Sequence, residues 1–95
     1  NNVCAHLEAL ANLARCHLLL GNWSAAREAA EKVLSVDDKH VKSIYAKAES
    51  LYNTCQFEQA LMLFHRGMVG NPYKMHNVHI NLTFKAAKNK LLPTS

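Results

Sequence analysis

The sequence predicts an all-α fold made of two tandem helical hairpins, and three observations support it. Two stretches of chain repeat the same order of apolar and small residues at an offset of about 34 residues, so that Ala60 falls on Ala26 and Phe57 on Trp23. Each stretch holds two segments with the apolar spacing of a helix, joined by a short break. Two prolines and three glycines in 95 residues are few for a β protein with many turns. A repeat of this period, with two helices in each unit, indicates a stacked helical array.

The first hairpin is expected to pair residues 1–20 with residues 24–36. The inward residues of its first helix are Val3, Leu7, Leu10, Leu13 and Ala14. Gly21 should end that helix, because glycine accepts the left-handed backbone that follows a helix C-terminus. The inward residues of its second helix are Ala26, Ala29, Ala30, Val33 and Leu34, small enough for the two helices to approach closely. Trp23 should pack back into the hairpin.

The second hairpin is expected to pair residues 40–54 with residues 57–69. Asp37-Asp38 should form a turn and the N-cap of the first of these helices. Its buried stripe is Ile44, Ala48 and Leu51, and a different face carries Lys42, Tyr45 and Glu49. The inward residues of the second helix are Ala60, Leu61, Phe64 and Met68, with Gly67 at a close contact. Gly70-Asn71-Pro72 should stop it, because the residue before a proline disfavours helix.

A fifth helix is expected between Tyr73 and Leu92, without a partner hairpin. Its apolar stripe is Met75, Val78, Leu82 and Ala86, flanked by Ile80, Phe84, Ala87 and Leu91. Such a helix would cover the last repeat and turn its lysines to water, as the cap of a helical array must do.

This skeleton resembles the tetratricopeptide-repeat family over most of the chain. In the first repeat, residues 7–40, the fitting residues are Leu10, Leu13, Gly21 and Ala26. In the second, residues 41–74, they are Ala48, Phe57, Ala60, Phe64 and Pro72. The resemblance implies one domain over residues 1–95: a superhelix of two helix-turn-helix repeats and a capping helix at about 75–92. Because such arrays generally need about three repeats, we expect a longer array, or contact between another chain and the first helix.

Composition narrows the class of protein. No apolar run is long enough to cross a bilayer, and no signal peptide is visible, so a cytoplasmic protein without membrane contact is expected. Cys4, Cys16 and Cys55 form no C-x-x-C pair and are interpreted as reduced thiols, the first two as small core residues. The net charge of +4 is uneven, since no acidic residue follows Glu58 while several lysines do. This asymmetry is interpreted as the solvated surface of a capping helix, with an acidic partner, a microtubule surface or nucleic acid as the alternatives.

Catalysis and cofactor binding find little support in the sequence. It holds no glycine-rich phosphate loop, nucleophile elbow or H-E-x-x-H motif, so we expect neither an enzyme nor a cofactor. His76 and His79 share a helix face, but no Cys or carboxylate accompanies them, and no metal site is predicted. Lys85 and Lys88 could contact phosphates, yet no aromatic platform is interleaved with them, which disfavours nucleic acid.

Protein recognition is therefore the expected function. In the tetratricopeptide family the first helix of each repeat lines a concave groove that holds an extended peptide or a partner helix. By repeat position, the groove residues here are Asn12, Arg15, Lys42, Tyr45, Ala46, Glu49, His76 and His79. Some members grip the terminal carboxylate of chaperones with Lys, Asn and Arg. Asn12 and Lys42 match two of those positions and Ala46 replaces an arginine, which leaves a co-chaperone-like domain for acidic peptide tails as the alternative.

A more specific resemblance lies in the expected third and fourth helices. The pattern K-x-x-Y-x-K-A-E-x-L-Y begins at Lys42, F-E-x-A-L begins at Phe57, and H-R-G begins at His65. This string is similar to the tetratricopeptide subunit of the outer dynein arm docking complex. The resemblance implies a non-catalytic adaptor in the cilium that helps to anchor outer dynein arms on axonemal doublet microtubules. Its partners would be dynein or other docking subunits, many of them coiled coils.

Overall fold

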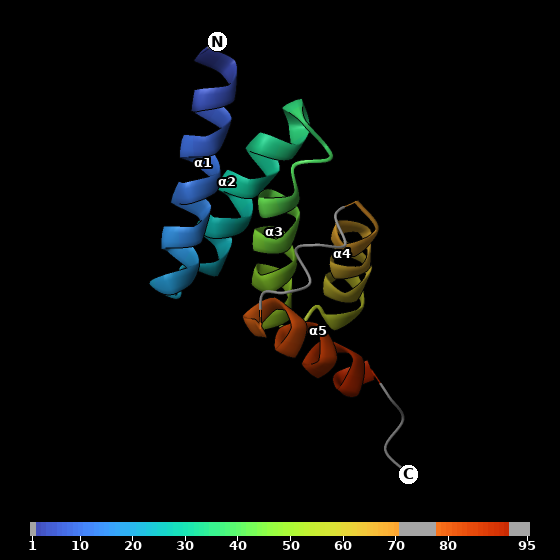
Figure 1. Cartoon of the computed structure of the whole chain (residues 1–95). Helices are drawn as coiled ribbons and strands as arrows, with labels where there is room; N and C mark the ends of the chain where they lie inside the picture. Colours follow the sequence, from blue (N-terminus) through green and yellow to red (C-terminus); the bar gives the residue numbers. More distant parts are fainter. Residues whose placement is uncertain (1, 71–77, 92–95) are drawn as a thin grey trace.

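The computed structural model describes residues 2–70 and 78–91, and the side chains of residues 5–67 and 82–91 within them. In these ranges the chain forms five helices in a row (Figure 1). They are α1 (Asn2–Leu19), α2 (Trp23–Val36), α3 (Val41–Asn53), α4 (Phe57–Gly70) and α5 (Val78–Leu91). The predicted all-α class is confirmed. The expected start of the fifth helix, residues 73–77, lies outside the described ranges.

The helices pack in sequence as two hairpins and a closing helix. α1 contacts α2, α3 contacts α4, and α2 joins the hairpins by lying against α3. α1 also contacts α3, so the first helices of the two hairpins are neighbours. α5 rests against α4 and α3 and runs across the end of the second hairpin (Figure 1). The outer faces of α1 and α5 therefore form the two ends of the described stack.

Both hairpins turn through the same backbone motif. Gly21 (φ 79°) and Cys55 (φ 65°) hold the left-handed conformation at equivalent positions of the two repeats. In each turn the next amide donates to the carbonyl five residues back, Asn22 N to His17 O at 2.8 Å and Gln56 N to Leu51 O at 2.8 Å. This is the Schellman arrangement, which satisfies carbonyls at a helix end. The glycine stop at Gly21 is thus confirmed, and a cysteine takes the same conformation at a steric cost of about 1–2 kcal/mol.

Two apolar clusters hold the helices together, and they differ in side-chain size. The first cluster, between the hairpins, is built from Ala14, Ala29, Ala30 and Ala46, with Leu18 against it. The second, inside the second hairpin, is built from Tyr45, Ala48, Leu51, Ala60 and Phe64. Phe84 of α5 lies edge-on to Phe64, with ring centroids 6.1 Å apart, and so attaches the closing helix to this cluster. Burying a phenylalanine or leucine contributes about 1.5–3 kcal/mol, so the second cluster carries more of the stability.

A glycine makes room for the largest side chain of the second cluster. A Cβ atom added to Gly67 would lie 2.6 Å from Cε1 of Tyr45, closer than real Cβ contacts come. Gly67 is buried, and its expected close contact is confirmed. The equivalent residues of the first hairpin are Ala11 and Val33, 4% and 0% exposed. The bulky residue is therefore on α3 in the second hairpin and on α2 in the first.

Three side chains expected in the core are exposed instead. Leu13 is 46% exposed, because it lies on the side of α1 away from α2. Cys16, predicted as a small core residue, is exposed on the same side as a free thiol. Leu82 is 60% exposed, because α5 packs through Thr83 and Ala87. Helical spacing located an apolar stripe in each case but did not settle which stripe is covered.

The start of α3 also differs from the expectation. His40, not the Asp37-Asp38 pair, is its N-cap, and the His40 carbonyl accepts hydrogen bonds from the amides of Ser43 (3.1 Å) and Ile44 (3.0 Å). The Asp37 carboxylate instead accepts the Lys39 amide at 3.1 Å and shapes the preceding turn. Other helix ends agree with the expected ones within a residue or so, as is usual for frayed termini.

None of the helices in residues 2–70 and 78–91 combines the length and the apolarity that a bilayer span requires.

Candidate functional site

The predicted groove residues do not all reach the surface. Asn12 and Arg15 are exposed on α1, Lys42 is exposed on α3, and Glu49 is half-buried beside it. Arg15 and Glu49 occupy equivalent positions of the two hairpins. These four side chains remain candidates for contact with a partner.

The prediction is wrong for Tyr45 and Ala46, which are buried. Ala46 is 6% exposed, because it packs among the alanines of α1 and α2. Tyr45 is 5% exposed, because α4 and Gly67 receive its ring. Both belong to the joints between helices and offer no free surface. His76 lies outside the described residues, and the His79 side chain lies outside the described side chains.

A charged cluster links the first helices of the two hairpins. The Glu8 carboxylate on α1 lies 3.2 Å from the Lys42 ammonium and 3.3 Å from Nε2 of His40. The hydrogen bond from Lys42, followed by the one from His40, holds the pKa of Glu8 below its ordinary value. Lys42, the expected cation of the groove, therefore already has an anionic partner within the chain. Glu8 and Lys42 stand one repeat period apart in the sequence, and this spacing was the signal that could have revealed the pair.

A serine extends this cluster in the order that hydrolases use. The Ser43 hydroxyl lies 3.1 Å from Nδ1 of His40, whose Nε2 meets Glu8. A nucleophile, a base and an orienting acid follow one another, as in a catalytic triad. Ser43 is 0% exposed, however, so a substrate carbonyl cannot approach its oxygen. The arrangement fastens the start of α3 to α1.

A second apolar face of α1 lies opposite its buried one. This face, the α1 stripe, consists of exposed residues that recur every three or four positions: Ala5, Ala9, Leu13 and Cys16 on α1, and Leu20 directly after its end. On α3 the matching positions include Ser43 and Ser50, 0% and 1% exposed, which are buried on the side that α2 covers. Lys47 of that face pairs with Glu31 of α2 at 3.3 Å. This side of α3 is thus covered by α2, whereas the same side of α1 is open.

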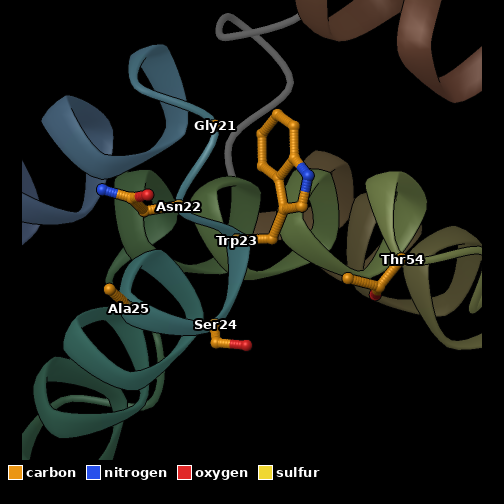
Figure 2. Close-up of a pocket in the computed structure, with 6 residues that line it drawn as sticks. All are labelled: Gly21, Asn22, Trp23, Ser24, Ala25 and Thr54. Atoms are coloured by element: carbon orange, nitrogen blue, oxygen red, sulfur yellow. The ribbon is translucent and has the colours of Figure 1, made fainter.

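Trp23 lines an open recess between the two hairpin turns. Figure 2 shows its indole standing out from the start of α2, with Thr54 of the second turn across the recess. The recess has a volume of about 430 Å³ and is lined by Gly21, Asn22, Trp23, Ser24, Ala25 and Thr54. None of these six carries a charge, so the recess holds no acid–base pair. The expected packing of Trp23 is realised in part, because its side chain is half-buried.

Buried polar atoms mark the inner side of α3 and the end of α1. Among the described residues, the Tyr45 hydroxyl and Nδ1 of His17 have no hydrogen-bond partner. Burial raises the pKa of Tyr45, which keeps its hydroxyl neutral. The described side chains also contain no cluster of three His, Cys, Asp or Glu residues placed to hold a metal ion. The exposed α1 stripe, with the polar side chains of α1 and α3 near it, rather than a pocket, is therefore the candidate site.

This arrangement defines a class of protein. Four of the described helices pack as two helical hairpins, and α5 packs against the second. Residues 7–40 match the family model of the tetratricopeptide repeat. The chain therefore contains a tetratricopeptide repeat, and its helices are packed as the helix-turn-helix units of that class are.

Three proteins to which the chain is similar carry the same name. The chain is 35% identical over 77 residues to outer dynein arm-docking complex subunit 4 of Bos taurus, an alignment that covers 81% of this chain and 11% of the bovine protein. The Homo sapiens protein of that name is 34% identical over 77 residues, which are 81% of this chain and 12% of the human protein. The Xenopus laevis protein is 42% identical over 53 residues, 56% of this chain and 10% of that protein. The chain thus matches only about a tenth of these relatives' length.

Proposed function

We propose that this chain is a non-catalytic adaptor that binds another polypeptide through the open face of α1. The observation that carries the proposal is the α1 stripe, four exposed apolar or small residues on a helix whose opposite face is already buried, continued by Leu20 in the turn. Contiguous exposed apolar surface of this kind marks sites of protein contact. The only triad-like geometry found among the described residues, at Ser43, is sealed from substrate, which favours a binding role over a catalytic one.

The proposed occupant is a helix with small residues on its contacting face. The contact between α2 and α3 supplies the example, because Ala29 and Ala30 of α2 pack in one cluster with Ala46 of α3. Small side chains permit a close helix–helix approach, and Leu13 and Leu20 of the stripe would fill the spaces between them. The helix would come from polypeptide other than residues 1–95.

The polar side chains next to the stripe would set orientation. Asn12 and Arg15 on α1, with Lys42 and Glu49 on α3, are proposed to meet the polar part of the partner. Charged groups at the rim of an interface contribute more to specificity and to the association rate than to affinity. His76 and His79, the other two residues predicted for the groove, belong to the same proposal.

The proposed partners are subunits of the outer dynein arm docking complex, and the proposed place is the cilium, where the adaptor would help to hold outer dynein arms on doublet microtubules. The support is the name shared by the similar proteins, together with a match over 81% of this chain at 35% identity. In the same proposal residues 1–95 form one domain, with repeats at about 7–40 and 41–74 and a closing helix at about 75–92.

Crosslinking of the tagged chain to proteins of a ciliary extract tests this proposal. We expect docking-complex subunits to be recovered with crosslinks to α1, and to be lost with Leu13→Glu/Leu20→Glu. A matched control is Val36→Glu/Met62→Glu, which places the same charges on exposed apolar residues, 65% and 67% exposed, of α2 and α4. Circular dichroism should show all three proteins equally helical. Equal losses in both variants, or recovery without docking subunits, would contradict the proposal.

An acidic peptide tail is the second candidate ligand, and Lys42 is the observation in its favour. Its side chain is 51% exposed on α3, next to α1. Because Glu8 already pairs with Lys42, a terminal carboxylate would have to compete with that side chain. Glu8→Gln should therefore strengthen the binding of an acidic tail peptide several-fold, whereas Lys42→Ala should abolish it. If Glu8→Gln leaves the affinity unchanged, this candidate is wrong.

A further inference from the structure

The surface of α5 carries positive charge that no described acidic residue pairs with. Lys85, Lys88 and Lys90 are exposed, and among the described residues none of the three forms an ion pair. No acidic residue follows Glu58 in the sequence, so this end of the molecule has no anions of its own on the same helix. By contrast, charged residues elsewhere have partners within the chain: Lys47 pairs with Glu31 of α2, and Arg66 pairs with Asp38 in the turn between α2 and α3. The cationic end is thus left for an external partner.

Two of these lysines are held in place by aromatic rings. Nζ of Lys88 lies 5.4 Å from the centre of the Phe84 ring, and Nζ of Lys90 lies 6.0 Å from the centre of the Phe57 ring. Cation–π contacts of this kind contribute roughly 0.5–1 kcal/mol at exposed sites. They restrict the lysines, which lowers the entropy that a partner must remove on binding.

Apolar groups accompany the charge on α5. Leu82 is 60% exposed and lies one helical turn before Lys85, and Leu91 is 43% exposed and follows Lys88 by three residues. Residues three apart are neighbours on a helix surface. Leu82, Lys85, Lys88 and Leu91 therefore follow one another obliquely around the exposed side of α5, with two lysines between two leucines. We call these four residues the α5 face.

The composition of the α5 face favours a polypeptide over a nucleic acid as its ligand. Nucleic acids without a specific sequence are held by basic grooves whose aromatic rings stack on the bases. Phe84 and Phe57 are only partly exposed and lie under lysines, so the α5 face presents leucines where stacking rings would be needed. Carboxylates combined with apolar side chains match both components of this face.

We infer that the α5 face is a second docking surface, separate from the α1 stripe, and that it binds an acidic polypeptide segment carrying apolar side chains. The two surfaces lie on opposite ends of the described stack (Figure 1). An adaptor could in this way connect two proteins. The inference does not depend on the identity of the partner at α1.

A fluorescent peptide of repeated Glu-Glu-Leu units is the probe, titrated with the chain and followed by anisotropy. We expect binding that weakens as salt is raised from about 50 to about 200 mM, because exposed charges are screened. Lys85→Gln/Lys88→Gln should weaken it about three- to tenfold, the sum of two exposed charge contacts. Leu82→Ser should weaken it about two- to fivefold without changing the charge.

The matched control is Lys32→Gln/Lys39→Gln, which removes the same two charges from exposed lysines outside the α5 face. We expect it to bind the probe as the unaltered chain does. An equal loss in this control would show attraction by net charge alone and overturn the inference. Tighter binding of oligothymidylate than of the peptide would overturn it in favour of nucleic acid. Leu13→Glu/Leu20→Glu should leave probe binding intact, so a failure at α5 is distinguishable from a failure of the α1 proposal.

Discussion

The two hairpins follow one backbone plan and fill it with different side chains. Equivalent positions of the two repeats share the same turn conformation, as Gly21 and Cys55 do. The cluster on the first hairpin consists of alanines, whereas the cluster inside the second hairpin contains the aromatic rings of Tyr45 and Phe64. α3 is covered on two sides, by α2 and by α4, whereas the α1 stripe is open. Residue spacing thus sets the architecture of both hairpins, while side-chain volume decides where stability resides and where surface is left for a partner.

Removing the most fully buried aromatic ring of the second hairpin should have the greatest effect. Phe64 is 1% exposed, and the first hairpin has Ala30 at the matching position. Phe64→Ala should lower the free energy of unfolding by about 3–5 kcal/mol, through lost burial and the cavity left behind. Urea denaturation followed by circular dichroism measures this. Met62→Ala on the same helix, 67% exposed, should change it by less than about 0.5 kcal/mol; similar losses in both variants would contradict the assignment of the core.

The two hairpins place the bulky residue of one contact on opposite helices, Tyr45 against Gly67 in the second and Val33 against Ala11 in the first. This difference can be tested directly. Gly67→Val alone should cost about 1–3 kcal/mol of unfolding free energy, because the added carbons meet the Tyr45 ring. Tyr45→Ala alone should cost a similar amount or more by leaving a cavity. Together they restore the Ala–Val combination of Ala11 and Val33, so the double variant should be more stable than the sum predicts by about 1–2 kcal/mol.

A double-mutant cycle by urea denaturation gives that coupling energy. If the two changes add to within about 0.5 kcal/mol, the two positions do not share one space, and the proposed exchange is wrong.

The shared turn conformation predicts opposite effects for its two residues. Gly21→Ala should destabilise by about 1 kcal/mol, and Cys55→Gly should stabilise by up to about 1 kcal/mol, since a side chain is costly in the left-handed region. Thermal unfolding is the measurement. Thr54→Gly is the control, because Thr54 has a φ of −102° and its hydroxyl donates to the Ser50 carbonyl at 3.0 Å. A destabilising Cys55→Gly would show that the left-handed turn is not strained.

The smallest effect should come from the link between α1 and α3. Because the pKa of Glu8 is lowered in the folded chain, its stabilising contribution is present above the ordinary value of 4.5 and is lost as pH falls through the lowered one. The unaltered chain should be slightly more stable than Glu8→Gln at pH 7, and the difference should vanish at pH 3. Urea midpoints at both values measure it. Glu28→Gln, on the exposed side of α2, should show no such difference.

Much of the architecture was predictable from the sequence, because the repeat period and the turn residues act locally. The helices, the Gly21 stop and the close contact at Gly67 all follow from spacing and side-chain size. Which of two apolar stripes is covered was not predictable from spacing. Leu13 and Leu82 were expected inside, yet each lies on the side of its helix that no described element covers.

The candidate site was less predictable for a related reason. Tyr45 was expected on a free face, but its burial depends on Gly67, a residue of another helix that leaves room for the ring. Lys42 was correctly expected at the surface, but its pairing with Glu8 required two helices to be brought together in register. Contacts between elements decide which polar residues remain available, and a pattern within one element does not contain that information.

The exchange between Tyr45–Gly67 and Ala11–Val33 has a consequence for building chimaeras. Grafting α4 next to α1 would place Gly67 beside Ala11 and leave a void, whereas grafting α2 next to α3 would drive Val33 into the tyrosine ring. Single helices of this chain are therefore not interchangeable parts. The unit that can be duplicated or transplanted is the whole hairpin, because both residues of the contact, Tyr45 with Gly67 or Ala11 with Val33, are then kept together.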